Sequence, residues 1–226
     1  MPRLAIFDCD GTLVDSGATI YAALTLSLEQ HGQIVPPARV ARHVVGLSLV
    51  EAFELLVPTA PRNQLEAMAE TYRKAFQNLR AAGQVEEPLF DGITDLIDAL
   101  DSDGWLLAVA TGKSDRGLRH CLASHGLENR FSSLQTADRH PSKPHPAMAL
   151  AAMAEAGAEP EQTVFIGDTA WDMGCARAAG VGAIGVAWGY HEKAELLAQG
   201  AHAVAEEPGD VPGLASQWFG GLYGES

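Results

Sequence analysis

The stretch Leu4-Ala5-Ile6-Phe7-Asp8-Cys9-Asp10-Gly11-Thr12 places two acidic residues directly after an apolar run. The continuous apolar run 4–7 is typical of a strand that is buried on both faces of a parallel sheet. Asp8 and Asp10 follow where the run stops, and Gly11 relieves backbone crowding in the turn. The stretch therefore predicts a buried strand that carries functional groups at its C-terminal end.

From residue 88 onward, short apolar runs alternate with helical segments. Further strands are expected at 105–110, near 134, at 163–166, 182–186 and 203–204, and helices at 93–100, 114–125, 146–156, 170–179 and 193–197. This alternation predicts the α/β class with an open parallel sheet. Ligands of such sheets bind beyond the carboxyl ends of the strands.

The segment 16–87 contains no convincing strand. Helices are expected at 22–28, at 49–56 before Pro58, and at 64–82 before Gly83, and Asp15 and Ser16 are expected to cap the first of them. The pattern predicts a small helical domain, 16–87, inserted between 1–15 and 88–226.

Composition excludes several classes of protein. The 226 residues carry 15 basic and 29 acidic side chains, a formal net charge of −14, with no basic run, so neither nucleic acid nor an anionic membrane is an expected partner. No apolar run reaches the roughly 18 residues of a membrane span, and the N-terminus does not resemble a signal peptide. Cys9, Cys121 and Cys175 lie far apart in the sequence. A cytoplasmic protein without disulfides is therefore expected.

Polar residues gather at one edge of the predicted sheet. Asp8, Thr111 and Asp168 each follow the end of a predicted strand, and Lys143 follows the loop after the short strand near 134. Because the carboxyl ends of parallel strands meet at one edge, these four side chains are expected to converge.

The acidic residues fit a divalent cation. Asp8 and Asp10 repel each other at such close spacing, so a pair of this kind usually holds a cation or shares a proton. Mg²⁺ prefers oxygen ligands and retains some of its waters. Asp168 could add a third carboxylate, and Asp172 lies one helical turn further on.

The remaining polar groups suit phosphoryl transfer, which needs charge neutralisation and in-line positioning. Thr111, Gly112 and Lys143 can donate hydrogen bonds to phosphate oxygens. Asp8 can act as a nucleophile that forms an aspartyl-phosphate. Asp10 can protonate the leaving alcohol and later deprotonate the attacking water.

Four motifs in order resemble the haloacid dehalogenase-like hydrolase superfamily, phosphatase branch. They are Asp8-Cys9-Asp10-Gly11-Thr12-Leu13-Val14-Asp15-Ser16, Thr111-Gly112-Lys113, Lys143-Pro144 and Gly167-Asp168-Thr169-Ala170-Trp171-Asp172. The resemblance implies a Rossmann-like catalytic core, 1–15 and 88–226, with a helical cap, 16–87. The position of the cap is similar to that in the subgroup of phosphoglycolate phosphatase and β-phosphoglucomutase.

The resemblance also implies roles for the site residues. Mg²⁺ would be held by Asp8, by the backbone carbonyl of Asp10 and by Asp168, with Asp172 in support. Thr111 and Lys143 would hold the phosphoryl group. The dehalogenases of this superfamily lack the second aspartate, so Asp10 argues against dehalogenation. The four motifs together favour a phosphatase that acts on a small phosphorylated metabolite, with phosphoglycolate as one candidate.

The cap leaves its own role open. Arg42 and His43 precede the glycine-containing loop Gly46-Leu47-Ser48, and they could contact a substrate carboxylate or hydroxyl, or they could simply lie on a solvated helix face.

Three other functions are weighed against hydrolysis. A sugar phosphomutase would carry a histidine near the start of the first cap helix, but Gly17-Ala18-Thr19-Ile20-Tyr21 contains none. Phosphonate cleavage would need a Schiff-base lysine in the cap, where Lys74 is the one lysine. A non-catalytic protein that binds phosphorylated metabolites is the third alternative. The sequence leaves monomer and homodimer open.

Overall fold

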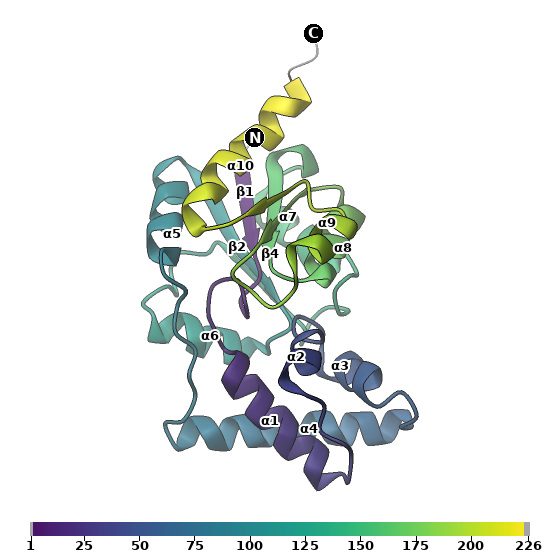
Figure 1. The fold of residues 1–226 in the computed structure, drawn as a ribbon. Coiled ribbons are helices and arrows are strands. Elements are labelled where there is room, and N and C mark those ends of the chain that lie inside the picture. The colour runs from purple at the N-terminus through teal and green to yellow at the C-terminus, as the bar shows by residue number, and fades with distance from the viewer. Residues whose placement is uncertain (1, 224–226) are drawn as a thin grey trace.

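The computed structural model describes residues 2–223 and confirms the α/β class. Its six strands form one parallel sheet in the order β3-β2-β1-β4-β5-β6 (Figure 1). The strands are β1 (Arg3–Phe7), β2 (Trp105–Thr111), β3 (Ser133–Thr136), β4 (Thr163–Gly167), β5 (Gly182–Val186) and β6 (Ala203–Ala205). The sequence near the N-terminus therefore supplies a central strand, with β2 on one side and β4 on the other.

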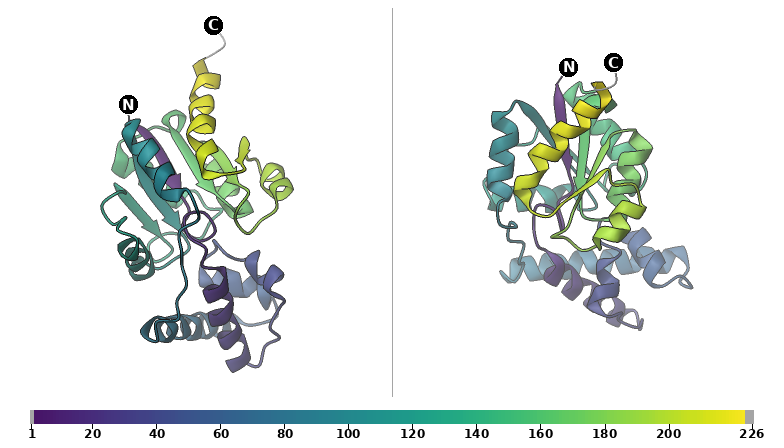
Figure 2. Two further views of the ribbon diagram at one scale, coloured as in Figure 1. Left: turned by 60° about the vertical axis from the view of Figure 1, so that its left-hand side comes forward. Right: turned by 45° about the horizontal axis from the view of Figure 1, so that its top comes forward.

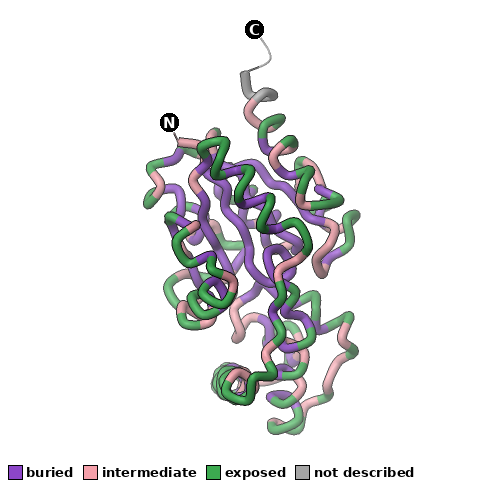
Figure 3. The backbone as a smooth tube through the Cα atoms, turned by 90° about the vertical axis from the view of Figure 1, so that its left-hand side faces the viewer, coloured by how far each residue is buried: buried purple, intermediate pink, exposed green. Residues whose placement is uncertain are grey.

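Helices cover both faces of the sheet, as Figure 2 shows. Alternate residues of β1 point to opposite faces, so Ala5 and Phe7 join one apolar cluster while Leu4 and Ile6 join another. The first cluster packs under α5 (Ile93–Ser102), α6 (Asp115–Ser124) and α10 (Val211–Tyr223), and the second under α7 (Ala147–Ala156), α8 (Ala170–Ala179) and α9 (Lys193–Ala198). The strands between these layers are mostly buried (Figure 3).

Four helices lie beyond the carboxyl ends of the strands (Figure 1). They are α1 (Gly17–Gln30), α2 (Ala38–Arg42), α3 (Leu49–Leu56) and α4 (Arg62–Ala81). Their buried apolar side chains form a third cluster that includes Leu28, Phe53 and Met68. The predicted boundaries of this helical unit at residues 15/16 and 87/88 stay a prediction, but the chain leaves and re-enters the core there side by side, since Val14 forms an antiparallel bridge with Leu89.

The structure differs from the sequence-based expectation mainly at the C-terminus. No helix was expected after 193–197, yet α10 runs from Val211 to Tyr223. Its apolar spacing, Val211, Leu214, Ala215 and Trp218, is helical, but Pro212 and three glycines reduce the local helix propensity. Packing of this apolar face on the sheet therefore outweighs the propensity. The short helix α2 was also not expected.

Within residues 2–223, no helix is both long and apolar enough to cross a membrane. The cysteines Cys9, Cys121 and Cys175 are all buried and free. Their wide spacing in the sequence had indicated that they form no disulfide framework.

The packing of α10 on β5 depends on Gly182. A Cβ at this position would lie 2.9 Å from both the Trp218 ring and a methyl group of Val164. We expect Gly182→Ala to lower the free energy of unfolding by about 1–3 kcal/mol through overpacking. Gly213→Ala, where nothing lies within 4 Å of the new methyl group, should instead raise it by about 0.5–1 kcal/mol, because alanine favours the helix. Urea unfolding of both variants tests this, and equal effects would contradict it.

Candidate active site

The predicted site residues meet at the carboxyl edge of the sheet. Asp8 directly follows β1, Thr111 ends β2 and Asp168 directly follows β4, and all three are fully buried. Lys143 reaches the same edge from the loop between β3 and α7, and 1% of it is exposed. The structure therefore brings together four side chains that lie far apart in the sequence.

Lys143 lies between two carboxylates. Its Nζ is 3.0 Å from Asp8 Oδ2 and 2.6 Å from Asp172 Oδ1, and it also donates a hydrogen bond to the carbonyl of Ala110. The other oxygen of Asp172 accepts hydrogen bonds from the backbone N–H and the hydroxyl of Thr169 at the start of α8. Both oxygens of Asp172 are thus occupied, and its geometry suits holding Lys143 in place.

Burial sets the protonation of this cluster. Loss of hydration raises the pKa of Asp8 to about 7; the Lys143 ammonium opposes this rise, and Asp172 adds to it. Burial and the neighbouring Asp172 and Asp8 also raise the pKa of Asp168. Burial disfavours the charge of Lys143, but the adjacent Asp172 and Asp8 outweigh it and raise its pKa, so Lys143 stays an ammonium ion.

The carboxylates fit a hard divalent cation. Oxygen atoms of Asp8, Asp168 and Asp172 all lie within 4.8 Å of one another, and one lysine faces three buried acids. Oδ2 of Asp8 is buried and accepts no hydrogen bond from residues 2–223. Carboxylate oxygens that lie next to such an excess of negative charge are the kind of ligand that Mg²⁺ prefers.

Glycines allow the chain to close tightly around Asp168. Its oxygens accept hydrogen bonds from the Thr12 hydroxyl at 2.8 Å and from the backbone N–H of Tyr190 at 2.9 Å. A Cβ on Gly11, which has a φ of +84°, would lie 2.2 Å from Asp168 Oδ2, and one on Gly189 would lie 2.1 Å from Asp168 Cβ. The glycine of the first motif is thus required for contact as well as for the turn.

Asp10 lies apart from the three clustered acids and has its own partners. Its Oδ1 accepts a hydrogen bond from the Ser16 hydroxyl and lies 2.8 Å from Lys113 Nζ. The expected capping role of Ser16 is therefore wrong: Ser16 stands at the N-cap of α1, but its hydroxyl turns to Asp10 and makes no cap hydrogen bond. The nearby Asp15 accepts a hydrogen bond from Gly17 N at 3.3 Å.

A chain of buried ion pairs continues from Asp10 into the segment that leaves α4. Lys113 Nζ is also 2.5 Å from Glu87 Oε1, and Glu87 Oε2 is 3.0 Å from Arg80. The side chains of Asp10, Lys113 and Glu87 are at most 9% exposed. Lys113 belongs to the motif Thr111-Gly112-Lys113, but the sequence predicted no role for its side chain. No pattern in the sequence indicated that Glu87 takes part in the site.

The loop Gly46-Leu47-Ser48 is docked on the core. A Cβ on Gly46 would lie 3.7 Å from Asp8 Oδ2, and one on Gly112 would lie 2.6 Å from the carbonyl oxygen of Leu47. The backbone N–H of Ser48 donates a hydrogen bond of 2.8 Å to the Ser142 hydroxyl. The structure therefore represents a state in which this loop covers the carboxyl edge of the sheet.

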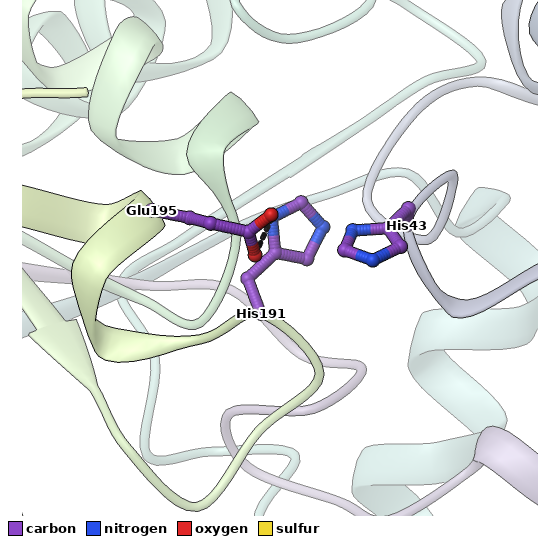
Figure 4. Close-up of side chains that lie close together, drawn as sticks. All are labelled: His43, His191 and Glu195. Atoms are coloured by element: carbon purple, nitrogen blue, oxygen red, sulfur yellow. Dashed lines mark ion pairs between the residues drawn. The ribbon is translucent and has the colours of Figure 1, made fainter. Parts of the chain in front are cut away.

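Arg42 and His43 lie beside this docked loop and face core side chains. Arg42 stacks over the Tyr190 ring at 6.0 Å, and the ring of His43 meets that of His191 edge-on at 4.8 Å (Figure 4). Trp171 Nε1 donates a hydrogen bond to the carbonyl of His43. Neither Arg42 nor His43 lines the cavity described below, so the structure does not bring these two predicted substrate-binding residues to it.

His43, His191 and Glu195 lie close enough together to suggest a metal site (Figure 4). However, His191 Nδ1 accepts a hydrogen bond from Ala170 N, so Nε2 carries the proton of the neutral ring and has no lone pair for a metal. Burial and His43 lower the pKa of His191, which keeps the ring neutral. We interpret this cluster as a contact between helical unit and core.

A cavity of about 790 Å³ lies between the core and the helical unit. Asp10, Gly112 and Lys113 line it on the core side, and residues 44–52, which include the start of α3, line it on the other side together with α4. The cavity therefore opens directly onto the predicted acid–base residue.

Comparisons with known proteins agree with this arrangement. Residues 5–186 match a family model described as haloacid dehalogenase-like hydrolase. A probable phosphatase, IndB, of Dickeya dadantii is 34% identical over 95% of this chain and 94% of its own. A phosphoglycolate phosphatase of Pseudomonas putida is 31% identical over 92% of this chain and 77% of its own. The crystal structure of a hydrolase from Pseudomonas syringae superposes with a TM-score of 0.83 at 26% identity, over 95% of this chain and 98% of that one.

The raised pKa of Asp8 predicts how Mg²⁺ affects stability. Folding raises this pKa from its ordinary 3.8 to about 7, so the metal-free protein loses the associated stability as the pH rises from about 4 through 7. Mg²⁺ competes with the proton, so it should raise the melting temperature more at pH 8 than at pH 5. Thermal unfolding with excess Mg²⁺ or a chelator measures both shifts.

Asp8→Asn should remove most of the difference between the Mg²⁺-induced shifts in melting temperature at pH 5 and pH 8. Asp95→Asn, on the exposed face of α5, should preserve this difference. An equal Mg²⁺ shift at pH 5 and pH 8 in the unsubstituted protein would contradict the assignment.

Lys113→Met should destabilise the fold strongly, because it leaves Asp10 and Glu87 buried without their shared cation. We expect a loss of about 3–5 kcal/mol in the free energy of unfolding, measured in urea at pH 7. The double variant Lys113→Met/Asp10→Asn should recover part of this loss, since it removes the charge of Asp10, whereas Glu87 keeps its ion pair with Arg80. An exposed surface ion pair contributes about 1 kcal/mol or less. A free energy of unfolding for Lys113→Met within about 1 kcal/mol of that of the unsubstituted protein would therefore show that the buried ion pairs are not strongly stabilising.

Proposed function

We propose that this chain, which belongs to the haloacid dehalogenase-like hydrolase family, is a magnesium-dependent phosphatase that forms an aspartyl-phosphate on Asp8. Phosphate-monoester hydrolysis is supported by relatives that are named phosphatases. The observation that carries the proposal is the buried Oδ2 of Asp8, which accepts no hydrogen bond from the described residues and lies 3.0 Å from Lys143. A carboxylate oxygen held in this way is free to attack a phosphorus atom.

In the first half-reaction, an oxygen of Asp8 attacks the phosphorus in line with the ester oxygen. The bond between phosphorus and the ester oxygen breaks, and Asp10, acting as the general acid, gives a proton to the leaving alcohol. Lys143, the hydroxyl of Thr111 and the backbone N–H of Gly112 hold the phosphoryl oxygens. Asp172 keeps Lys143 in position through the 2.6 Å ion pair.

In the second half-reaction, Asp10 is a carboxylate and takes a proton from a water molecule that attacks the same phosphorus. The bond to Asp8 breaks, which releases inorganic phosphate and restores both carboxyl groups to their starting forms. The contacts of Asp10 with Ser16 and Lys113 support this double role, because they hold the side chain in one orientation through both steps.

Asp8, Asp168 and the backbone carbonyl of Asp10 would hold the Mg²⁺ ion, which would neutralise charge on the phosphoryl group. Asp172 acts as a positioning residue for Lys143 in this proposal, because both of its oxygens are already bonded.

The alternatives lack comparable support. Lys74, which phosphonate cleavage would need, is 69% exposed and pairs with Glu70 on the surface of α4. The first turns of α1, residues 17–21, contain no histidine for a phosphomutase. The proposal includes a small phosphorylated metabolite as the substrate and a cytoplasmic location, supported by the acidic composition and the free cysteines.

Asp8→Asn should abolish Mg²⁺-dependent phosphate release, because an amide oxygen is not a nucleophile. We expect a loss of about 10³-fold or more in kcat. A phosphate-release assay over a panel of phosphorylated metabolites measures this, with Asp95→Asn as the matched control. Full activity of folded Asp8→Asn would refute the mechanism.

Asp10→Asn should retain binding but slow turnover by about 10²–10⁴-fold, since it removes the proton donor and acceptor and not the nucleophile. A phosphate ester with a very good leaving group, such as 4-nitrophenyl phosphate, should show a smaller loss in its first half-reaction. Equal losses for both esters in single-turnover experiments would contradict the assignment of Asp10 as the acid.

A further inference from the structure

The cavity beside Asp10 belongs to the docked state of the loop 46–48. That loop already contacts Thr169, Gly112 and Ser142. With this loop docked, a space of about 790 Å³ remains next to the proposed phosphoryl site. A volume of this size falls within the range of pockets that enclose drug-sized ligands, and it greatly exceeds the needs of a two-carbon leaving group.

The wall of the helical unit that faces this space carries an apolar patch. The patch is formed by half-buried side chains of α1, α3 and α4, namely Ile20, Leu49, Val50, Tyr72 and Phe76. Arg62, Arg73 and Gln77 also line the cavity, at exposed positions, and the two arginines pair with Glu66 and Glu70. The rings of Tyr72 and Phe76 lie 6.0 Å apart and are tilted by 34°. These side chains would exclude water from an apolar ligand and would gain little from a small charged one.

The cations near Asp10 are already neutralised. Lys113 is shared between Asp10 and Glu87, and Arg80 pairs with the same Glu87. A substrate such as phosphoglycolate carries a carboxylate close to its ester oxygen, and this carboxylate would meet Asp10 without an unpaired cation beside it. Arg116, at the start of α6, lines the cavity and has no acidic partner within residues 2–223, but it is exposed.

We infer that the substrate is a phosphomonoester whose alcohol carries an apolar, ring-sized body that packs on Tyr72 and Phe76. The inference rests on the proposed phosphatase function and specifies the leaving group. Tyr72 and Phe76 act as specificity-determining residues: they contact the body of the alcohol, not the phosphoryl group. Short carboxylate-bearing esters are poor substrates in this account.

The test compares esters that differ in the body of the alcohol and little in leaving-group chemistry: ethyl phosphate, 2-phenylethyl phosphate, 2-cyclohexylethyl phosphate and phosphoglycolate. We expect kcat/KM for both ring-bearing esters to exceed that for ethyl phosphate and for phosphoglycolate by at least about tenfold, the effect of burying two or more methylene groups. The difference should lie mainly in KM. Phosphate release from excess ester, with Mg²⁺ present, gives these constants.

Phe76→Ala should lower kcat/KM for the ring-bearing esters more than for ethyl phosphate, so that the preference falls about five- to tenfold. Asn78→Ala, on the exposed side of the same helix, should preserve the preference. Thermal unfolding establishes that both variants are folded. A preference that survives Phe76→Ala would overturn the role of this side chain.

A preference for phosphoglycolate that Arg116→Ala removes, or equal rates for ethyl and ring-bearing esters, would overturn the inference while the phosphatase function stands. No phosphate release from any ester, including 4-nitrophenyl phosphate, would instead overturn the proposed function itself. The two failures are thus distinguishable in one assay.

Discussion

The site depends on the burial of three carboxylates, Asp8, Asp168 and Asp172, around a single lysine. Charges that are removed from water are costly unless they are paired, so Lys143 must stay ionised and must stay in place. The ion pair with Asp172 achieves this, and the hydrogen bonds from Thr169 in turn fix Asp172 at the start of α8. The remaining excess of negative charge would favour the binding of a cation.

The parallel sheet makes this concentration of charge possible. Asp8 and Asp168 stand just beyond the ends of strands, and Asp172 lies in the first turn of α8. Backbone N–H groups there replace the lost hydration: Cys9 N donates to Asp8, and Tyr190 N donates to Asp168. Glycines at 11 and 112 let the backbone and the docked loop approach to distances that a side chain would block, and Gly46 adopts a φ of +93° that disfavours other residues. The same contacts that cover Asp8 leave a cavity on the side of Asp10.

Much of this architecture could be predicted from the sequence, because strand ends and apolar periodicity are local signals. The convergence of Asp8, Thr111, Lys143 and Asp168 follows from parallel strands that share one edge. The partners of Asp10 could not be predicted, since Lys113 and Glu87 meet where the chain returns from the helical unit. The placement of Arg42 and His43 against Tyr190 and His191 depends on how the two parts dock, which no local pattern encodes.

In the proposed mechanism, the phosphoryl group passes first to Asp8 and only then to water. The stereochemical course at phosphorus tests this most directly, with a monoester made chiral by oxygen isotopes and sulfur. Two successive in-line transfers predict net retention of configuration in the released thiophosphate. Net inversion would show that water attacks the substrate directly, and it would contradict the assignment of Asp8 as the nucleophile.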